Sequence, residues 1–333
     1  MDGHTLVRWI EGADDIFEAF EGRGDIYETC RNWIEEWFQC RKFCVKEKDK
    51  RKLEKEFLEQ FKSTLEITIN RIRDEDRRSE VKETFLRSME LLIEKIPENS
   101  CKLTFAFAPY LISWNIRRFI EYFRNPIWFE NLEVDKNSEE SLVEYFSKLN
   151  EYFNEDLIEI IGGLRQKNIF DSDIEEETIR ILYEGLNEKL KSLGIRNDEP
   201  VGVIKVLHIL SPHYFPLIDN PIARSLAISN VFRSFTLEKE NSKKKGRKHV
   251  YRICGSTIVC SRTITIYNAK VKLNVDSYIK YMKEIQQIFQ RNRDSIEYLE
   301  KKSNKSFLKL LDQAFYIRYS IDIARRLKPT DSS

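Results

Sequence analysis

One stretch of this sequence concentrates the residue types that carry acid–base and nucleophilic chemistry. The segment VLHILSPHYFPLIDNPIARSL, Val206–Leu226, contains two of the four histidines of the chain, three of its eight prolines and one aspartate, Asp219. Lys205 directly precedes it. A neutral lysine amine is a nucleophile, and a carboxylate can stabilise a developing positive charge or activate water. The segment is therefore the first place to look for a reactive site.

A tight turn followed by a helix is predicted around Lys205. Pro200 and Gly202 are turn-forming residues. The apolar run after them predicts a helix from about Val203 to Leu210, because the Ser-Pro pair that follows stops a helix.

A second helix is predicted to begin within two residues of Pro221, because proline is tolerated in the first turn of a helix. Asp219 or Asn220 would then be the N-cap. Such a cap accounts for the aspartate without any catalysis. In this structural alternative, His208 and His213 occupy partly hydrated pockets.

The motifs PVGVIK (Pro200–Lys205) and LIDNPIARSL (Leu217–Leu226) together resemble those of the helix–hairpin–helix DNA glycosylases. In that family a hairpin turn precedes an apolar helix, and a catalytic aspartate stands at the head of the next helix. The resemblance covers roughly residues 140–230. It implies a multi-helix fold, DNA as the partner and base excision as the activity, with no cofactor.

This resemblance also implies roles for single residues. Asp219 falls where the catalytic members keep their aspartate, and Lys205 falls where the bifunctional members keep their Schiff-base lysine. Gly202 would belong to the hairpin whose backbone N–H groups hold a DNA phosphate. Val201 and Val203 stand where the family has glycines. The alternative is a non-catalytic helical module that binds nucleic acid or protein.

Base excision requires the target nucleotide to leave the base stack and enter a pocket with aromatic walls. The aromatic residues Tyr214, Phe215 and Trp114 are the candidates for these walls. The alternative is that they are ordinary core aromatics.

A basic run provides the clearest signal for nucleic-acid binding. From Lys239 to Arg252 there are seven Lys or Arg residues and one acidic residue, Glu240. Such a run could contact phosphates through a salt-dependent attraction, or could be a solvated loop. The candidate DNA-contacting residues are Lys243, Lys244, Lys245, Arg247 and Lys248.

The composition and the spacing of special residues exclude several classes of protein and of site. With 56 basic and 55 acidic residues the net charge is +1, so only a local patch could attract nucleic acid. Hydrophobic residues make up 41% of the 333, enough for a real core. The six cysteines match neither a disulfide scaffold nor zinc-ligand spacing, and no nucleotide-binding glycine motif is present.

The setting is expected to be cytoplasmic, because no signal peptide or membrane span is recognisable in the sequence. Abundant Lys, Glu and Ile suggest a thermophile.

The predicted fold class is mainly α, with multi-helix bundle domains, a helix–hairpin–helix-like turn and a small β ribbon near residues 249–274. An N-terminal helical region is expected over 1–100. A helical domain is expected over 101–330, with the basic loop and ribbon at 237–274. Asp276 and Ser306 are the predicted N-caps of the last two helices.

Overall fold

The computed structural model describes residues 2–21, 24–39, 155–192, 199–229, 232–239, 245–254, 257–267 and 269–319, with single residues between 59 and 153. Within these ranges the chain is mainly helical, which confirms the mainly α class predicted from the sequence. In this part of the chain, no helix combines the length and the apolar character needed to cross a membrane.

The helices follow the period of their apolar residues. In α11, for example, the buried side chains include Tyr278, Tyr281, Met282, Ile285 and Phe289, at three- and four-residue spacing. The helices are α1 (Gly3–Glu21), α2 (Gly24–Gln39), α7 (Glu155–Arg165), α8 (Glu176–Ser192), α9 (Pro200–Leu210), α10 (Asn220–Ser229), α11 (Val275–Phe289), α12 (Arg293–Ser303) and α13 (Phe307–Tyr319).

The backbone also forms two antiparallel strand pairs, β1 with β4 and β2 with β3. The strands are β1 (Leu237–Lys239), β2 (Lys245–Cys254), β3 (Thr257–Tyr267) and β4 (Ala269–Val271). In the longer pair, Lys245 lies opposite Tyr267 at one end and Cys254 lies opposite Thr257 at the other.

The chain divides into two compact units, each made of separate stretches of sequence. Unit 1 comprises Met1–Gly22, Gly163–Tyr183 and Ser211–Ser333, and unit 2 comprises Arg23–Gly162 and Glu184–Leu210. The domain boundary predicted near residue 100 lies outside the described residues.

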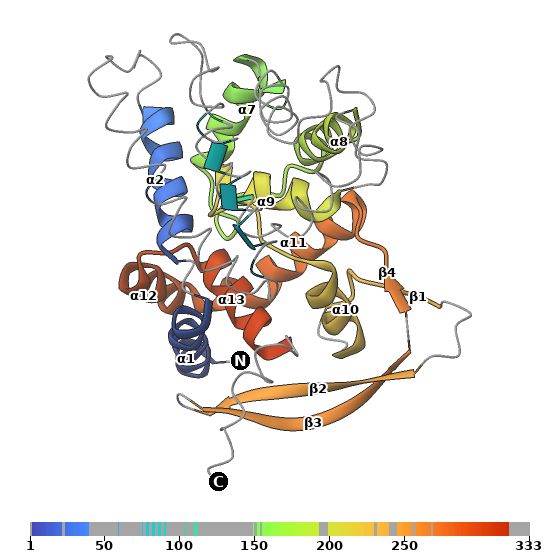
Figure 1. The fold of residues 1–333 in the computed structure, drawn as a ribbon. Coiled ribbons are helices and arrows are strands. Elements are labelled where there is room, and N and C mark those ends of the chain that lie inside the picture. The colour runs from blue at the N-terminus through green and yellow to red at the C-terminus, as the bar shows by residue number, and fades with distance from the viewer. Residues whose placement is uncertain are drawn as a thin grey trace. The chain divides into compact units, whose positions relative to one another are not determined.

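The N-terminal helix α1 belongs to unit 1, although the sequence placed it in an N-terminal region ending near residue 100. It packs against α12 and α13 (Figure 1). Its apolar face, which includes Leu6 and Ile10, is buried. The Lys305 ammonium group donates to Asp14 at 2.7 Å and to Glu18 at 2.6 Å. These contacts join opposite ends of the chain, so local sequence patterns do not reveal them.

The caps of the last helices agree with the sequence in one case only. Ser306 accepts the Lys309 N–H at 3.3 Å, as predicted for the N-cap of α13. The predicted cap Asp276 is wrong, because α11 begins two residues earlier. Its N-cap is Asn274, which accepts the Ser277 N–H at 3.0 Å, while the Ser277 hydroxyl accepts the Asn274 N–H at 2.9 Å. This reciprocal capping box satisfies both donors, and Asp276 lies in the first turn instead.

In unit 2, α9 is buried along most of its length, from Val203 to Leu210, and packs against α2. The ring of His208 is fully buried and stacks on Tyr27 with centroids 5.6 Å apart. The Tyr27 hydroxyl and His208 Nε2 lie 3.0 Å apart, within hydrogen-bonding distance. His208 is therefore a core histidine with a partner.

Candidate functional site

The nine residues between α9 and α10, Ser211–Asp219, are anchored along their length. The Ser211 hydroxyl donates to the Leu164 carbonyl at 3.0 Å, and the Ile169 N–H donates to the His213 carbonyl at 3.0 Å. The helices on either side end at Leu210 and begin at Asn220, as the sequence predicted. The segment is thus held in place within unit 1, up to the start of α10.

Asp219 is the N-cap of α10. Its carboxylate oxygen accepts the Ile222 N–H at 2.7 Å, and its carbonyl accepts the Ala223 N–H at 2.8 Å. The side chain is partly exposed. Negative charge is favoured at a helix N-terminus, where unpaired backbone N–H groups gather. Of the two caps predicted, Asp219 and Asn220, the structure has the first.

Two tyrosines of α11 hold the backbone just before Asp219. The Tyr278 hydroxyl donates to the Pro216 carbonyl at 2.9 Å, and the Tyr281 hydroxyl donates to the Leu217 carbonyl at a longer 3.4 Å. Both side chains are fully buried. Burial raises the pKa of both hydroxyls well above the ordinary value, and for Tyr281 the nearby charges of Asp312 and Asp219 add to this rise. Neutral, fixed donors thus position the chain next to Asp219.

The proposed pocket residues Tyr214 and Phe215 lie in the core of unit 1. Their rings meet edge to face with centroids 5.2 Å apart, and both side chains are buried. The Tyr214 hydroxyl accepts the Glu175 N–H at 2.9 Å and donates to the Asp173 carbonyl at 3.0 Å. Burial, with the Asp173 charge second, raises the pKa of Tyr214 to about 12. These contacts are those expected if Tyr214 and Phe215 are ordinary core residues, the alternative to a base pocket.

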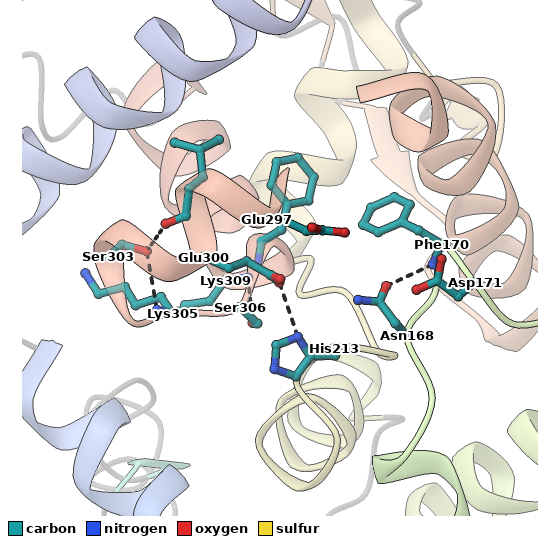
Figure 2. A network of polar contacts seen from close by, with 12 residues as sticks. Asn168, Phe170, Asp171, His213, Glu297, Glu300, Ser303, Lys305, Ser306 and Lys309 are labelled. Carbon is teal, nitrogen blue, oxygen red and sulfur yellow. Dashed lines mark hydrogen bonds and ion pairs between the residues drawn. The ribbon is translucent and has the colours of Figure 1, made fainter. Parts of the chain in front are cut away.

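The pairing of His213 with Glu300 was not expected from the sequence. Figure 2 shows the His213 ring turned toward Glu300, with Nδ1 3.2 Å from the carboxylate. The same oxygen accepts the Phe307 N–H at 2.7 Å, so Glu300 also holds the start of α13. The His213 side chain is 39% exposed. A separation of 87 residues hides this pair from any local motif.

Lys205 lies in α9 of unit 2 and is only 8% exposed. Asp219 belongs to unit 1, so the pairing of these two residues in one cleft stays a prediction.

Gly202 does not form a tight turn. Pro200 to Gly202 make the first turn of α9, which begins three residues before the predicted start at Val203. The prediction failed because proline fits the first turn of a helix as well as it fits a tight turn. A methyl group added at Gly202 would meet Leu190 at 3.7 Å and Glu199 at 3.8 Å, ordinary contact distances. Packing therefore does not require a glycine here.

The basic candidates fall into two groups. Lys245, Arg247 and Lys248 occupy positions on β2. Lys243 and Lys244 lie outside the described residues, as does the pocket candidate Trp114.

In the described part of the chain, no group of three or more His, Cys, Asp and Glu side chains is arranged to hold a metal ion. Cys30 is buried, and burial raises the pKa of its thiol to about 12. A thiol held neutral in this way is a poor nucleophile and a poor metal ligand.

Comparisons with known proteins find no relative. No family model matches the chain, and searches of curated proteins and of solved structures find no significant match.

Proposed function

We propose that this protein binds DNA and releases damaged bases, with Asp219 as the catalytic carboxylate. The observation that supports this most is the presentation of Asp219. It is a partly exposed carboxylate at the N-terminus of α10, on a backbone held by buried tyrosine hydroxyls. Catalytic groups need such a fixed geometry, because a shift of about 1 Å can cost two orders of magnitude in rate.

The chemistry suits an ionised carboxylate. Breaking the bond between a base and its sugar builds positive charge on the sugar ring, which a nearby carboxylate stabilises in the transition state. The same group can accept a proton from the attacking water. One carboxylate oxygen of Asp219 is used by the Ile222 N–H, and each carboxylate oxygen has further acceptor capacity.

Lys205 is proposed as an optional amine nucleophile. It lies on α9 and is largely buried, and the neutral form of a lysine amine is the form that attacks a sugar carbon. Attack would form a carbon–nitrogen bond to the sugar carbon as its bond to the base breaks. Opening of the sugar ring, with the ring oxygen leaving as a hydroxyl group, would then give a Schiff base.

The first experiment is incubation of the wild-type protein with a panel of duplexes, each carrying one damaged base, followed by alkali to cleave abasic sites. We expect strand cleavage on at least one duplex. Borohydride added during the reaction should trap a covalent adduct with wild type and none with Lys205→Gln. Cleavage after alkali without trapping would keep Asp219 and remove Lys205 from the mechanism.

A second candidate function, a non-catalytic binding module, is favoured by the structural contacts of the same residues. Asp219 already caps a helix, and Tyr214 and Phe215 are already core residues. A wild-type protein that binds duplex DNA but releases no base from any member of the panel would make this the better description.

A further inference from the structure

We propose that Asp312 of α13 is a positioning residue for Asp219, and that its buried charge acts on Asp219 across the hydroxyl group of Tyr281. This inference rests on the base release proposed above for its part in catalysis. The action of one charge on the other can be tested without any substrate.

A buried ion pair lies on α13. The Lys309 ammonium group lies 3.5 Å from one carboxylate oxygen of Asp312, and the two side chains are 2% and 9% exposed. Lys309 also lies over the ring of Phe17 of α1, with its nitrogen 5.4 Å from the ring centroid. Water and salt screen charges weakly in such a place, so a buried charge acts on its neighbours more strongly than a surface charge does. The base release proposed above does not use this pair.

Aromatic contacts bring this part of α13 close to Tyr281 of α11. The ring of Phe232 packs against Tyr281 with centroids 5.2 Å apart and against Phe315 with centroids 5.8 Å apart. Phe315 is three residues after Asp312, so the two lie on the same face of α13. The helix α13 also packs against α10, which Asp219 caps. The helices α10, α11 and α13, all in unit 1, therefore meet around Tyr281.

The hydroxyl group of Tyr281 is the point at which the two carboxylates act together. It lies 3.4 Å from the carbonyl of Leu217, two residues before Asp219. Burial raises the pKa of Tyr281 well above its ordinary value, and the negative charges of Asp312 and Asp219 add to this rise. Both carboxylates therefore lie close enough to act on this hydroxyl group, one from α13 and one from the N-terminus of α10.

Two carboxylates beside the same hydroxyl group also act on each other. A negative charge makes a nearby carboxylate hold a proton more tightly, whereas a positive charge makes it release the proton more easily. Asp312 therefore makes Asp219 a stronger base toward the attacking water, and Lys309 limits this effect so that Asp219 stays ionised. This balance suits a group that must be charged and must also accept a proton.

Other ionisable groups lie on the elements around Asp219. Tyr278 and Tyr281 of α11 are fully buried, and burial raises the pKa of both, so they are neutral at ordinary pH. Arg224 is the basic residue of α10, and its Nε is buried. The strands β1 and β4 also contact α10, and the side chains of their charged residues lie outside the described ones: Glu238, Lys239 and Lys270.

The first measurement is the titration of Asp219 itself. The carboxyl carbons of protein labelled with ¹³C-aspartate are followed by NMR between about pH 3 and 8, and the Asp219 signal is identified by its loss in Asp219→Asn. Asp312→Asn removes the buried negative charge. Asp276→Asn is the matched control, because Asp276 also lies on a helix of unit 1 and its side chain is 57% exposed.

We expect Asp219 to release its proton at a pH lower by about 0.5 unit or more in Asp312→Asn, because it loses a neighbouring negative charge. The control should titrate like wild type to within roughly 0.2 unit, because an exposed charge is screened. A midpoint of Asp219 that is unchanged or raised in Asp312→Asn, or an equal shift in the control, would overturn the role of Asp312.

A second variant guards against loss of the fold. Asp312→Asn leaves the ammonium group of Lys309 buried without this carboxylate, which costs stability. Lys309→Gln combined with Asp312→Asn removes both charges, and thermal unfolding checks that each variant is folded. The charge that acts on Tyr281 is that of Asp312, so the double variant should shift the Asp219 titration in the same direction by a smaller amount. No shift, or a shift to higher pH, would contradict the proposal.

Base release separates this inference from the proposed function. On a duplex that the wild type processes, the acidic limb of kcat against pH should move to lower pH in Asp312→Asn, with duplex affinity unchanged. An unmoved limb would remove Asp312 from the mechanism while base release stands. A wild-type protein that releases no base, but whose Asp219 titration shifts in Asp312→Asn, would overturn base release and leave the action of Asp312 on Asp219 standing.

Discussion

The carboxylate of Asp219 caps a helix whether or not it takes part in catalysis, and substitution separates the two roles. Replacing Asp219 with Ala removes the acceptor of the Ile222 N–H, which lies 2.7 Å away. We expect this variant to lose about 1 kcal/mol of unfolding free energy. Asp219→Asn keeps an acceptor oxygen, so its loss should be a few tenths of a kcal/mol. Denaturant unfolding measures both, and equal stability of the Ala variant and wild type would contradict the capping role.

At this scale the sequence predicted residue types better than partners. It placed a cap at Asp219 or Asn220, because both types favour that position, and only the geometry selected the first. It could not pair His213 with Glu300 or His208 with Tyr27. Those partners lie 87 and 181 residues away, and nothing local to a histidine encodes them.

The helix α9 provides a test of the glycosylase resemblance at the scale of an element. Gly202 lies in its first turn, with room for a methyl group. Alanine favours helices over glycine by about 0.5–1 kcal/mol, so Gly202→Ala should stabilise the protein by up to that amount. If the backbone at Gly202 also holds a DNA phosphate, the same variant should bind DNA more weakly. Higher stability with unchanged affinity would contradict the phosphate contact that the resemblance implies at Gly202.

The buried tyrosines of unit 1 predict how stability depends on pH. Burial raises the pKa of Tyr214 to about 12 and those of Tyr278 and Tyr281 well above their ordinary value. The folded state therefore keeps these protons when the unfolded chain releases them, from about pH 10 upward. The associated stability is complete below about pH 10 and is lost as the pH rises toward and through the folded-state values.

Unfolding free energies measured at increasing pH should fall above about pH 10 in the wild type. Tyr278→Phe removes one of the three tyrosines and should flatten this fall, although the unpaired Pro216 carbonyl lowers stability at neutral pH. Tyr298→Phe, at an exposed position on α12, is the control and should follow the wild type. A slope unchanged in the Tyr278 variant would contradict the assigned role of this hydroxyl.

The helices around the site were predictable where residues that end or begin a helix, such as proline, mark their limits. Prolines and an apolar run set the end of α9 at Leu210 and the start of α10 at Asn220. The start of α9 at Pro200 was not predictable, because a proline with a glycine close after it suits both a turn and the start of a helix. Packing on α2 buries the helix and decides between the two.

At the scale of the whole molecule, two lysines near the C-terminal helices form ion pairs with carboxylates of α1, and one of these lysines is buried while the other is exposed. The Lys305 side chain is 8% exposed and donates to both Asp14 and Glu18. Burial alone would lower the pKa of Lys305, but these hydrogen bonds outweigh it, and the net pKa is raised. Lys302 pairs with Glu11 at 2.8 Å on the surface.

The two lysines are therefore a matched pair for substitution. We expect Lys305→Gln to lose about 1–3 kcal/mol of unfolding free energy, because two carboxylates lose their counter-charge in a largely buried place. Lys302→Gln should show no measurable change, because exposed pairs contribute little. Above about pH 10.5, where the unfolded chain releases the lysine proton, the loss in the Lys305 variant relative to wild type should begin to shrink, and it should disappear as the pH passes the raised pKa of Lys305 in the folded protein. Equal effects of the two substitutions would contradict this difference.

The periodicity of apolar residues predicted a mainly helical protein but not how its units are assembled. Helical periods are local, whereas unit 1 joins Met1–Gly22 to residues more than a hundred positions away. The contacts that join them, such as Lys305 with Asp14, depend on three-dimensional packing that no segment of the sequence specifies alone.

The catalytic role of Asp219 is tested most directly by the rate of base release by Asp219→Asn on a damaged duplex that the wild type processes. Duplex affinity and melting temperature are measured on the same preparation. We predict a loss of several orders of magnitude in rate, with affinity and melting close to wild type, because the negative charge matters only as the transition state forms. Base release by Asp219→Asn at a rate near that of wild type would contradict the proposal and remove Asp219 from the mechanism.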